Sequence, residues 1–159
     1  MQLARQYFKG EELTEEHYSK AKQLNFEAIY GRIPKSYEHL EFFEKLQAYI
    51  QQLWKNYKEE GYVLDPISKR KVVSDEITHG AKLLNYLIQS LETSRNILIL
   101  KQVLKYLSDK RTKVVHYIYD AVILDVSKED GKEVLHSVQN ILSEGGKYPV
   151  EYRDWETCN

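Results

Sequence analysis

The stretch from Lys113 to Val126, which reads KVVHYIYDAVILDV, decides the fold class of this chain. Most of its residues are β-branched or aromatic, and such residues favour strands over helices. One acid, Asp120, interrupts the apolar run, and aspartate is common in tight turns. We therefore predict two antiparallel strands that meet at Asp120.

Outside this stretch, helical periodicity dominates. Apolar residues recur at three- and four-residue steps, which is typical of amphipathic helices. We expect helices over residues 3–8, 14–30, 36–60, 74–108 with a bend or break at 89–93, and 127–143. Thr14 and Ser36 are the expected N-caps of the second and third helices, and Gly31 and Gly61 are their stop signals. A β-hairpin is expected at about 61–73, and a last strand at 150–153.

The predicted class is therefore α+β, mainly helical with a small antiparallel sheet and a β-hairpin. With seven glycines, three prolines and no repeat or low-complexity linker, residues 1–159 are expected to form a single unit. The single cysteine, Cys158, excludes an internal disulfide and a thiolate zinc cage. A single cysteine also fits a reducing compartment, so we expect a cytoplasmic protein. No apolar run approaches the length of a membrane span, so we expect no membrane partner.

The charge balance places limits on nucleic-acid binding. The 23 Lys and Arg residues face 24 Asp and Glu, a net charge of −1, so a surface for nucleic acid would have to be a local patch. One local cluster of cations is Lys69, Arg70 and Lys71, at the tip of the expected hairpin. Such clusters can follow a phosphate backbone, although a solvated loop tip is the usual explanation.

The helix over 14–30 carries the first candidate site. Tyr18, Lys22, Phe26 and Tyr30 fall at four-residue steps and so share one face. An ammonium can bind a phosphate while neighbouring rings pack on sugar and base, so this face suits a nucleotide. The alternative is a half-buried helix whose lysine extends its ammonium to water, and spacing alone favours that alternative.

Asp120 is the second candidate. A carboxylate within an apolar run is costly to bury unless it is paired or binds a cation, and oxygen ligands suit Mg²⁺. An aspartate that simply favours the turn is an equally good interpretation. The five histidines show no metal-ligand spacing, and the scattered glycines exclude Walker and dinucleotide-binding loops.

Taken in order, several stretches resemble the C-terminal fingers and palm portion of a family A (DNA polymerase I-like) DNA polymerase. Residues 21–31, AKQLNFEAIYG, look like motif B on the fingers O helix, and residues 117–126, YIYDAVILDV, look like motif C. Residues 85–89, NYLIQ, are similar to the Asn-x3-Gln pair that faces the primer–template. Residues 60–63 with the basic hairpin, and residues 150–152, are similar to further segments of the family.

This resemblance implies an incomplete right-hand polymerase fold. Residues 11–35 would be the O-helix region of the fingers, 36–110 long helices with the hairpin, and 111–159 a C-terminal palm segment. The implied roles are Tyr18, Lys22, Phe26 and Tyr30 for the incoming dNTP, with Lys22 on its triphosphate; Asn85, Gln89 and Tyr119 for the primer–template; and Asp120 for the catalytic Mg²⁺ ions.

Three positions depart from the family pattern. Tyr18 stands where an arginine is usual, Glu27 where glycine is common, and Ala121 where motif C has a second acid. Motif A, which supplies the other metal-binding aspartate, has no counterpart here. The resemblance therefore implies a divergent, phage-like split DNA polymerase, a nucleotidyltransferase active only with a partner chain that carries motif A. A non-catalytic DNA-binding or assembly protein with a decayed polymerase palm is the alternative.

Overall fold

The computed structural model describes residues 2–8, 10, 12–30, 33 and 35–153, and Gly31 and Cys158 lie outside these ranges. The chain is α+β and mainly helical, with two small antiparallel two-stranded sheets, as the sequence predicts. It divides into two compact units, Met1–Leu91 and Glu92–Asn159, where we expected one. The boundary between the two units lies inside one continuous helix, so no change in sequence composition marks the boundary.

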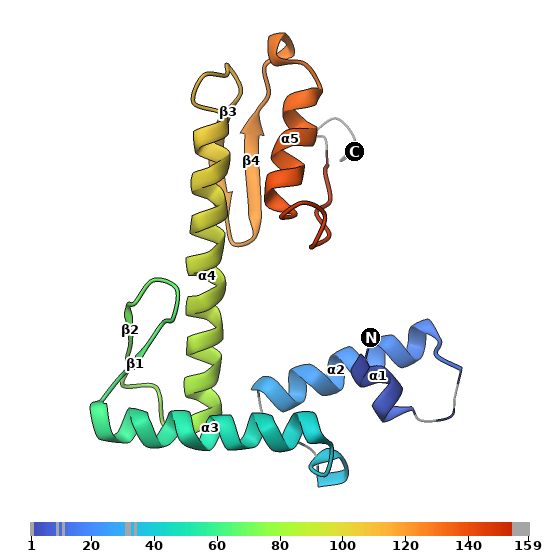
Figure 1. Cartoon of the computed structure of the whole chain (residues 1–159), viewed down its shortest axis with the longest axis vertical. Coiled ribbons are helices and arrows are strands. Elements are labelled where there is room, and N and C mark those ends of the chain that lie inside the picture. The colour runs from blue at the N-terminus through green and yellow to red at the C-terminus, as the bar shows by residue number, and fades with distance from the viewer. Residues whose placement is uncertain (1, 9, 11, 31–32, 34, 154–159) are drawn as a thin grey trace. The chain divides into compact units, whose positions relative to one another are not determined.

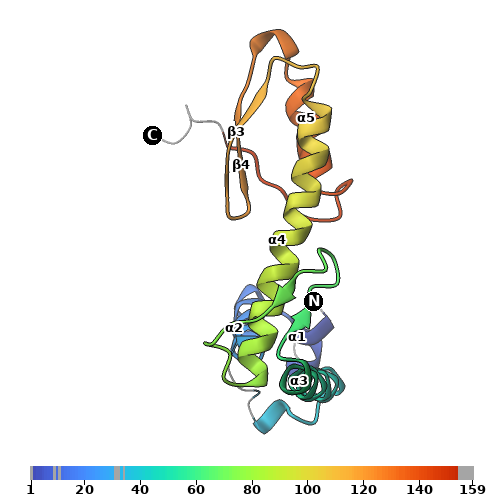
Figure 2. The same cartoon turned by 90° about the vertical axis from the view of Figure 1, so that its left-hand side faces the viewer.

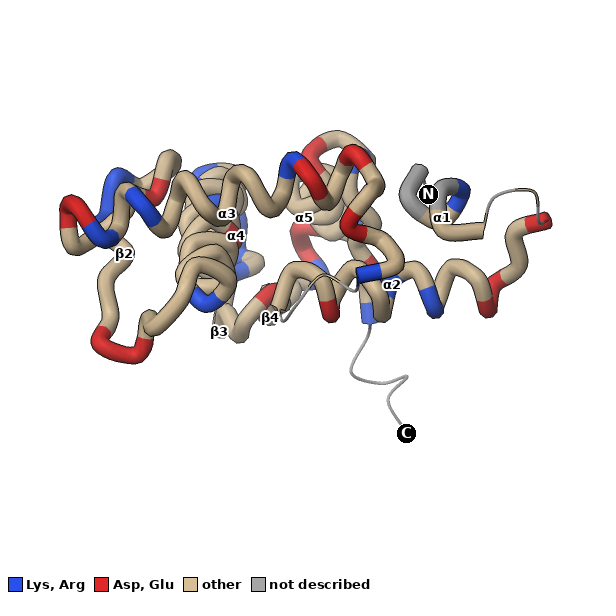
Figure 3. Tube along the Cα trace, turned by 90° about the horizontal axis from the view of Figure 1, so that it is seen from below, with Lys and Arg blue, Asp and Glu red and all other residues tan. Residues whose placement is uncertain are grey.

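The first unit is built from helices and one small hairpin (Figure 1). Its elements are α1 (Gln2–Tyr7), α2 (Glu15–Tyr30), the 3-10 turn η1 (Lys35–Tyr37), α3 (Glu41–Glu60), β1 (Val63–Leu64), β2 (Lys71–Val72) and the start of α4 (Gly80–Tyr106). Both lysines and glutamates occur along α2 and α3, so neither helix carries charge of a single sign (Figure 3).

Two of the predicted helix ends are confirmed by the structure. Thr14 caps α2, because its Oγ1 accepts a hydrogen bond of 3.4 Å from the backbone N–H of His17. Gly61 ends α3 in the left-handed region, with φ of 76° and its N–H bonded to the carbonyl of Tyr57. The predicted cap at Ser36 is wrong. Helix α3 begins at Glu41 behind Leu40, whose apolar side chain has no acceptor for a cap hydrogen bond and is buried in the core instead.

Two clusters of buried side chains meet on α3. One joins Leu53 of α3 to the hairpin and to α4, through Val63, Val72, Ile77, Leu83, Leu84 and Leu87. The other joins Ala28 of α2 to Ile33, Leu40 and Phe43. The hairpin stands beside the first turns of α4, as Figures 1 and 2 both show.

Helix α4 is one continuous element of 27 residues, so of the bend or break predicted at 89–93, the break is wrong. No proline or glycine lies between residues 81 and 106 to kink it. The helix also begins at Gly80 rather than at 74. Before it, Ser74 organises a turn, accepting hydrogen bonds from the backbone N–H groups of Glu76 and Ile77.

The second unit confirms the predicted strand pair. Strand β3 (Lys113–Ile118) pairs antiparallel with β4 (Ala121–Asp125), with a bulge between Val114 and His116. Both α4 and α5 (Glu133–Leu142) lie on the same side of this ribbon (Figure 2). The core between them contains Val103, Leu107, Val134 and Val138, with Val114 and Leu124 packed against it.

The end of the second unit differs from expectation in two ways. The helix expected over 127–143 is divided into a 3-10 turn, η2 (Lys128–Asp130), and α5, because Gly131 adopts φ of 69° between them. The strand predicted at 150–153 is wrong: these residues are irregular. Gln139 of α5 donates a hydrogen bond of 2.9 Å to the carbonyl of Val150, so this segment is held by a helix. None of the described helices is long and apolar enough to span a membrane.

Candidate functional site

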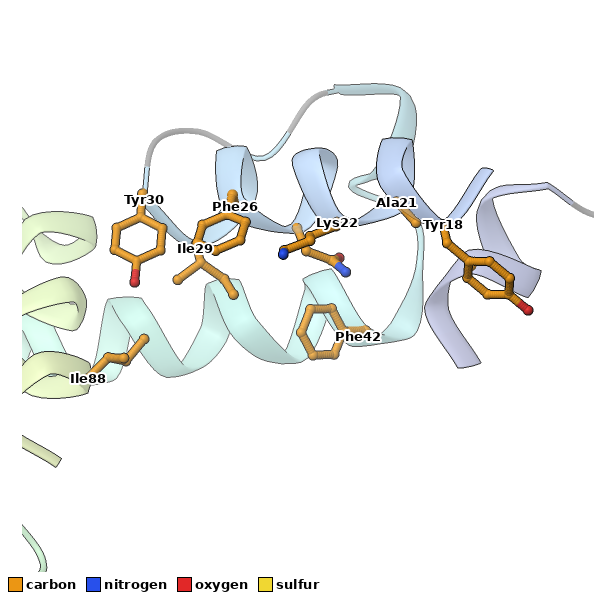
Figure 4. A pocket seen from close by; sticks show the side chains of 10 residues that line it. Tyr18, Ala21, Lys22, Phe26, Ile29, Tyr30, Phe42 and Ile88 are labelled. Carbon is orange, nitrogen blue, oxygen red and sulfur yellow. The ribbon is translucent and has the colours of Figure 1, made fainter. Parts of the chain in front are cut away.

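The row of residues predicted on α2 lies along an open groove of about 860 Å³ in the first unit. Its walls come from α1 (Ala4), α2 (Tyr18, Ala21, Lys22, Asn25, Phe26, Ile29, Tyr30), α3 (Phe42) and α4 (Ile88). Figure 4 shows the row along α2, with Phe42 and Ile88 contributed by the other helices. The structure therefore brings all four row residues into one groove.

The rings of the row are exposed rather than packed in the core. Phe26 is 51% exposed and Tyr30 is 45% exposed. The two rings stack on each other, with centroids 5.5 Å apart and planes 18° from parallel. Helix α2 buries small side chains, Ala21 and Ala28. The interpretation of the row as ordinary half-buried core therefore does not fit these two rings, whose exposed apolar surface is a feature of binding sites.

Lys22 supplies the positive charge of the groove. It lies one helical turn before Phe26, its side chain is exposed, and it makes no ion pair with any described residue. An ammonium is a compact point charge with three donors, which suits a phosphate. The groove thus combines an unneutralised cation with a pair of stacked rings.

Two contacts with other helices hold α2 in place. Near its middle, the Tyr7 hydroxyl of α1 donates a hydrogen bond of 2.7 Å to Asn25 Oδ1. Burial, with a smaller contribution from Tyr37, raises the pKa of Tyr7 to about 12, so this hydroxyl remains a neutral donor at physiological pH. At the carboxyl end, Asn85 Nδ2 donates a long hydrogen bond of 3.5 Å to the carbonyl of Tyr30.

Asn85 and Gln89 occupy successive turns of α4. Among the described side chains, Asn85 Oδ1 is the buried polar atom without a hydrogen-bond partner. Buried acceptors are rarely left unpaired, so this unpaired oxygen distinguishes Asn85 from the other described residues of α4. Gln89 is exposed and does not line the groove, whereas Ile88, between the two polar residues, does.

Sequence reasoning missed part of the groove. Phe42 is exposed on α3 although its neighbour Phe43 is buried. Adjacent helical positions point in different directions, but the sequence does not tell which of two phenylalanines enters the core. Ile29 and Ile88 follow the ordinary apolar pattern of a helix in the sequence. Only the meeting of α2, α3 and α4 shows that they line a site.

Tyr119 and Asp120 form the turn of the β3–β4 ribbon, in the second unit. Ile118 of β3 pairs with Ala121 of β4, so Tyr119 and Asp120 make the connection between the two strands. Tyr119 adopts φ of 55° and is 89% exposed. A non-glycine residue in the left-handed region of φ costs about 1–2 kcal/mol. Because the Tyr119 ring is exposed, its burial offsets little of this cost. Strained backbone of this kind is a feature of functional sites.

Asp120 presents an exposed carboxylate at this turn. Asp125 pairs with Lys113 at the opposite end of the ribbon. At about 3.3 Å per strand residue, Asp125 is more than about 13 Å away along the strand and cannot share a metal ion with Asp120. No group of three or more His, Cys, Asp or Glu that could hold a metal ion is found among the described residues. Asp120 fits one ligand position of a metal site, not a complete site.

The predicted residues thus form two clusters, one in each unit. Tyr18, Lys22, Phe26 and Tyr30 share the groove with Asn85 beside them; Tyr119 and Asp120 form the strained turn. No protein-family model matches this chain, and no curated protein matches its sequence. Chemically, the groove suits a nucleotide, and the turn suits one ligand of a hard divalent cation.

Proposed function

We propose that this chain is the C-terminal part of a template-directed DNA polymerase, which adds dNTPs to the 3′ end of a primer. The observation that carries the proposal is the α2 groove, where the exposed, stacked rings of Phe26 and Tyr30 lie one and two turns after Lys22. This is the arrangement that a nucleoside triphosphate needs: a cation for the phosphates and apolar faces for sugar and base.

Each groove residue then has a role in binding the incoming nucleotide. Lys22 binds the triphosphate, and Phe26 packs on the sugar. Tyr30 lies beside the templating base, and Tyr18 lines the far end of the groove, where it offers a hydroxyl in place of a second cation. Asn85, next to the carbonyl of Tyr30, and Gln89 one turn later contact the primer–template.

Asp120 is one ligand of the catalytic Mg²⁺ ions, and Tyr119 lies by the primer terminus. The two ions, when bound, activate the primer 3′ hydroxyl and stabilise the leaving pyrophosphate. Because the described residues offer one carboxylate at this turn, the second metal-binding acid comes from a partner chain that carries motif A.

The β3–β4 ribbon offers that partner a surface. Val115, Ile118 and Ile123 are exposed on it, and neither strand pairs with a third strand within the described ranges. A ribbon with unpaired strand edges and apolar side chains on its outer surface is prone to pair with another strand. A strand from the partner would cover this surface and bring an acid to the turn.

One observation favours a second candidate function, a non-catalytic DNA-binding or assembly protein with a decayed palm. Ala121 follows Asp120 where a second acid would strengthen a metal site, and the described residues complete no such site. This alternative keeps the groove and the ribbon but requires no metal at Asp120.

Primer extension distinguishes the two functions. The chain is assayed with Mg²⁺, dNTPs and primed DNA, alone and mixed with a candidate chain that carries motif A. We expect extension only in the mixture. Asp120→Ala should reduce the rate by at least about 10³-fold, because loss of a metal ligand removes several kcal/mol of transition-state stabilisation. Asp125→Ala, at the other end of the ribbon, is the matched control and should leave the rate unchanged.

A second pair of variants tests the groove. Lys22→Gln should raise the KM for dNTP, whereas Lys55→Gln, an exposed lysine on α3, should not. Equal rates for the parent chain and Asp120→Ala would contradict the catalytic role. No extension with any assembled partner, together with retained DNA binding, would favour the non-catalytic alternative.

A further inference from the structure

The tip of the β1–β2 hairpin carries three consecutive cations that the groove does not use. Lys69, Arg70 and Lys71 are exposed, and none of them forms an ion pair within the part of the chain that the structure describes. The acid nearest in sequence on the amino-terminal side, Asp65, is completely buried beneath the turn. The three ammonium and guanidinium groups therefore face solvent, with no exposed carboxylate paired to them among the described residues.

The turn beneath these cations is firmly held. Asp65 Oδ1 accepts hydrogen bonds from the backbone N–H groups of Ile67 at 2.7 Å and Ser68 at 2.9 Å. Its other oxygen accepts one of 2.6 Å from the Ser90 hydroxyl of α4. The N–H of Lys69 and the carbonyl of Arg70 bond to the Asp65 backbone, both at 2.9 Å. Burying the Asp65 carboxylate is costly. An ordinary solvated loop tip does not need such a buried group to organise its turn.

Two of the cations are held by neutral groups. The Lys71 ammonium lies 3.9 Å from the centroid of the Tyr62 ring. The Lys69 ammonium donates a hydrogen bond of 2.8 Å to the carbonyl of Pro66. A ring face or a carbonyl positions a cation without cancelling its charge, unlike a carboxylate. The hairpin thus presents fixed positive charges that remain free to attract an anion.

We infer that this tip is a second nucleic-acid contact, a site that binds the phosphate backbone of single-stranded DNA. The choice of DNA as the polyanion rests on the proposed function. The choice of a single strand rests on the exposed apolar side chains of Leu64 and Ile67 beside the cations. Unstacked bases offer apolar faces to such side chains, whereas a duplex keeps its bases stacked inside.

Fluorescence anisotropy with a labelled 20-nucleotide oligo(dT) tests this site. The full chain is titrated without Mg²⁺, dNTP or partner chain, so the result does not depend on catalysis. The test variant combines Lys69→Gln, Arg70→Gln and Lys71→Gln. The matched control removes three exposed cations without ion pairs elsewhere: Lys35→Gln, Lys55→Gln and Lys101→Gln.

We expect the hairpin variant to weaken binding roughly 100-fold at 0.1 M salt and to lower the salt slope by about 2, since each contact to a single strand contributes about 0.7. The control should change affinity much less. A variant with Lys69→Arg and Lys71→Arg should bind as the parent does. Circular dichroism on each variant establishes that the helices are intact.

Several outcomes would overturn the inference. Equal weakening by both triple variants would mean that only net charge matters. A loss seen with a 20-base-pair duplex but not with oligo(dT), or equal competition by a poly-glutamate peptide, would assign the tip to another partner. If the hairpin variant still binds oligo(dT) while Lys22→Gln raises the dNTP KM in primer extension, this site fails and the proposed function stands.

Discussion

Replacing Asp65 with alanine should destabilise the first unit more than any surface change. The carboxylate is fully buried and accepts three hydrogen bonds, from the Ile67 and Ser68 N–H groups and the Ser90 hydroxyl. A hydrogen bond to a charged group contributes about 1.5–3 kcal/mol, and relief from burying the charge offsets part of the sum. We expect a net loss of about 3–5 kcal/mol in the free energy of unfolding.

Urea unfolding measures this loss. Trp54, stacked on Tyr57 with ring centroids 5.6 Å apart, packs against the core that holds the hairpin, so its fluorescence reports on this unit. Replacing Trp155 with phenylalanine leaves Trp54 as the single tryptophan. With a slope of about 2 kcal/mol per molar, the midpoint should fall by about 2 M.

Two variants control the experiment. Asp65→Asn retains one acceptor oxygen and the side-chain shape, so it should lose clearly less stability than alanine. Asp75→Ala removes an exposed acid from the adjoining segment and should change the free energy by no more than about 0.5 kcal/mol. A midpoint for Asp65→Ala equal to that of the parent, or a loss no smaller for asparagine than for alanine, would refute the reasoning.

Three further predictions concern packing and ionisation. Leu83→Ala, at a side chain with no exposed surface, should lower the free energy of unfolding by about 2–5 kcal/mol, whereas Leu64→Ala, at a half-exposed position of the same unit, should change it little in the same urea assay. Gly80→Ala should lower the thermal unfolding midpoint despite the better helix propensity of alanine, because the new Cβ would meet Ile50 Cγ2 at 2.8 Å. Tyr7 has a raised pKa of about 12 against 10.0 unfolded, so its contribution to stability is complete below pH 10 and is lost as the pH rises through 12. Tyr7→Phe should make the free energy of unfolding less dependent on pH between pH 10 and 12. Curves of equal steepness for the variant and the parent chain would contradict the raised pKa of Tyr7.

Short-range signals predicted much of the fold because they depend on neighbouring residues. Thr14 caps α2 through a residue three positions away, and Gly61 ends α3 through its own φ. The turn at Asp120 follows from β-branched runs on both sides of it. Predictions failed where distant contacts decided the outcome. Helix α3 begins behind the buried Leu40 rather than at Ser36, and Val150, whose carbonyl accepts a hydrogen bond from Gln139 of α5, is in no strand.

The candidate site shows the same division. Four-residue spacing predicted that Tyr18, Lys22, Phe26 and Tyr30 share a face, which is a property of any α-helix. Whether that face is buried depends on what packs against α2. The structure answers that question: small side chains, including Ala28, take the packing face, and the rings line an open groove.

By itself, the sequence determined the α+β class, the two hairpins and the residues that share each helix face, because periodicity and turn chemistry act over a few residues. Tertiary structure alone decided that the groove is open, that Phe42 and Ile88 line it, and that a buried Asp65 holds the basic tip. These features arise between segments far apart in the chain, where burial is set by the packing of whole elements rather than by local pattern.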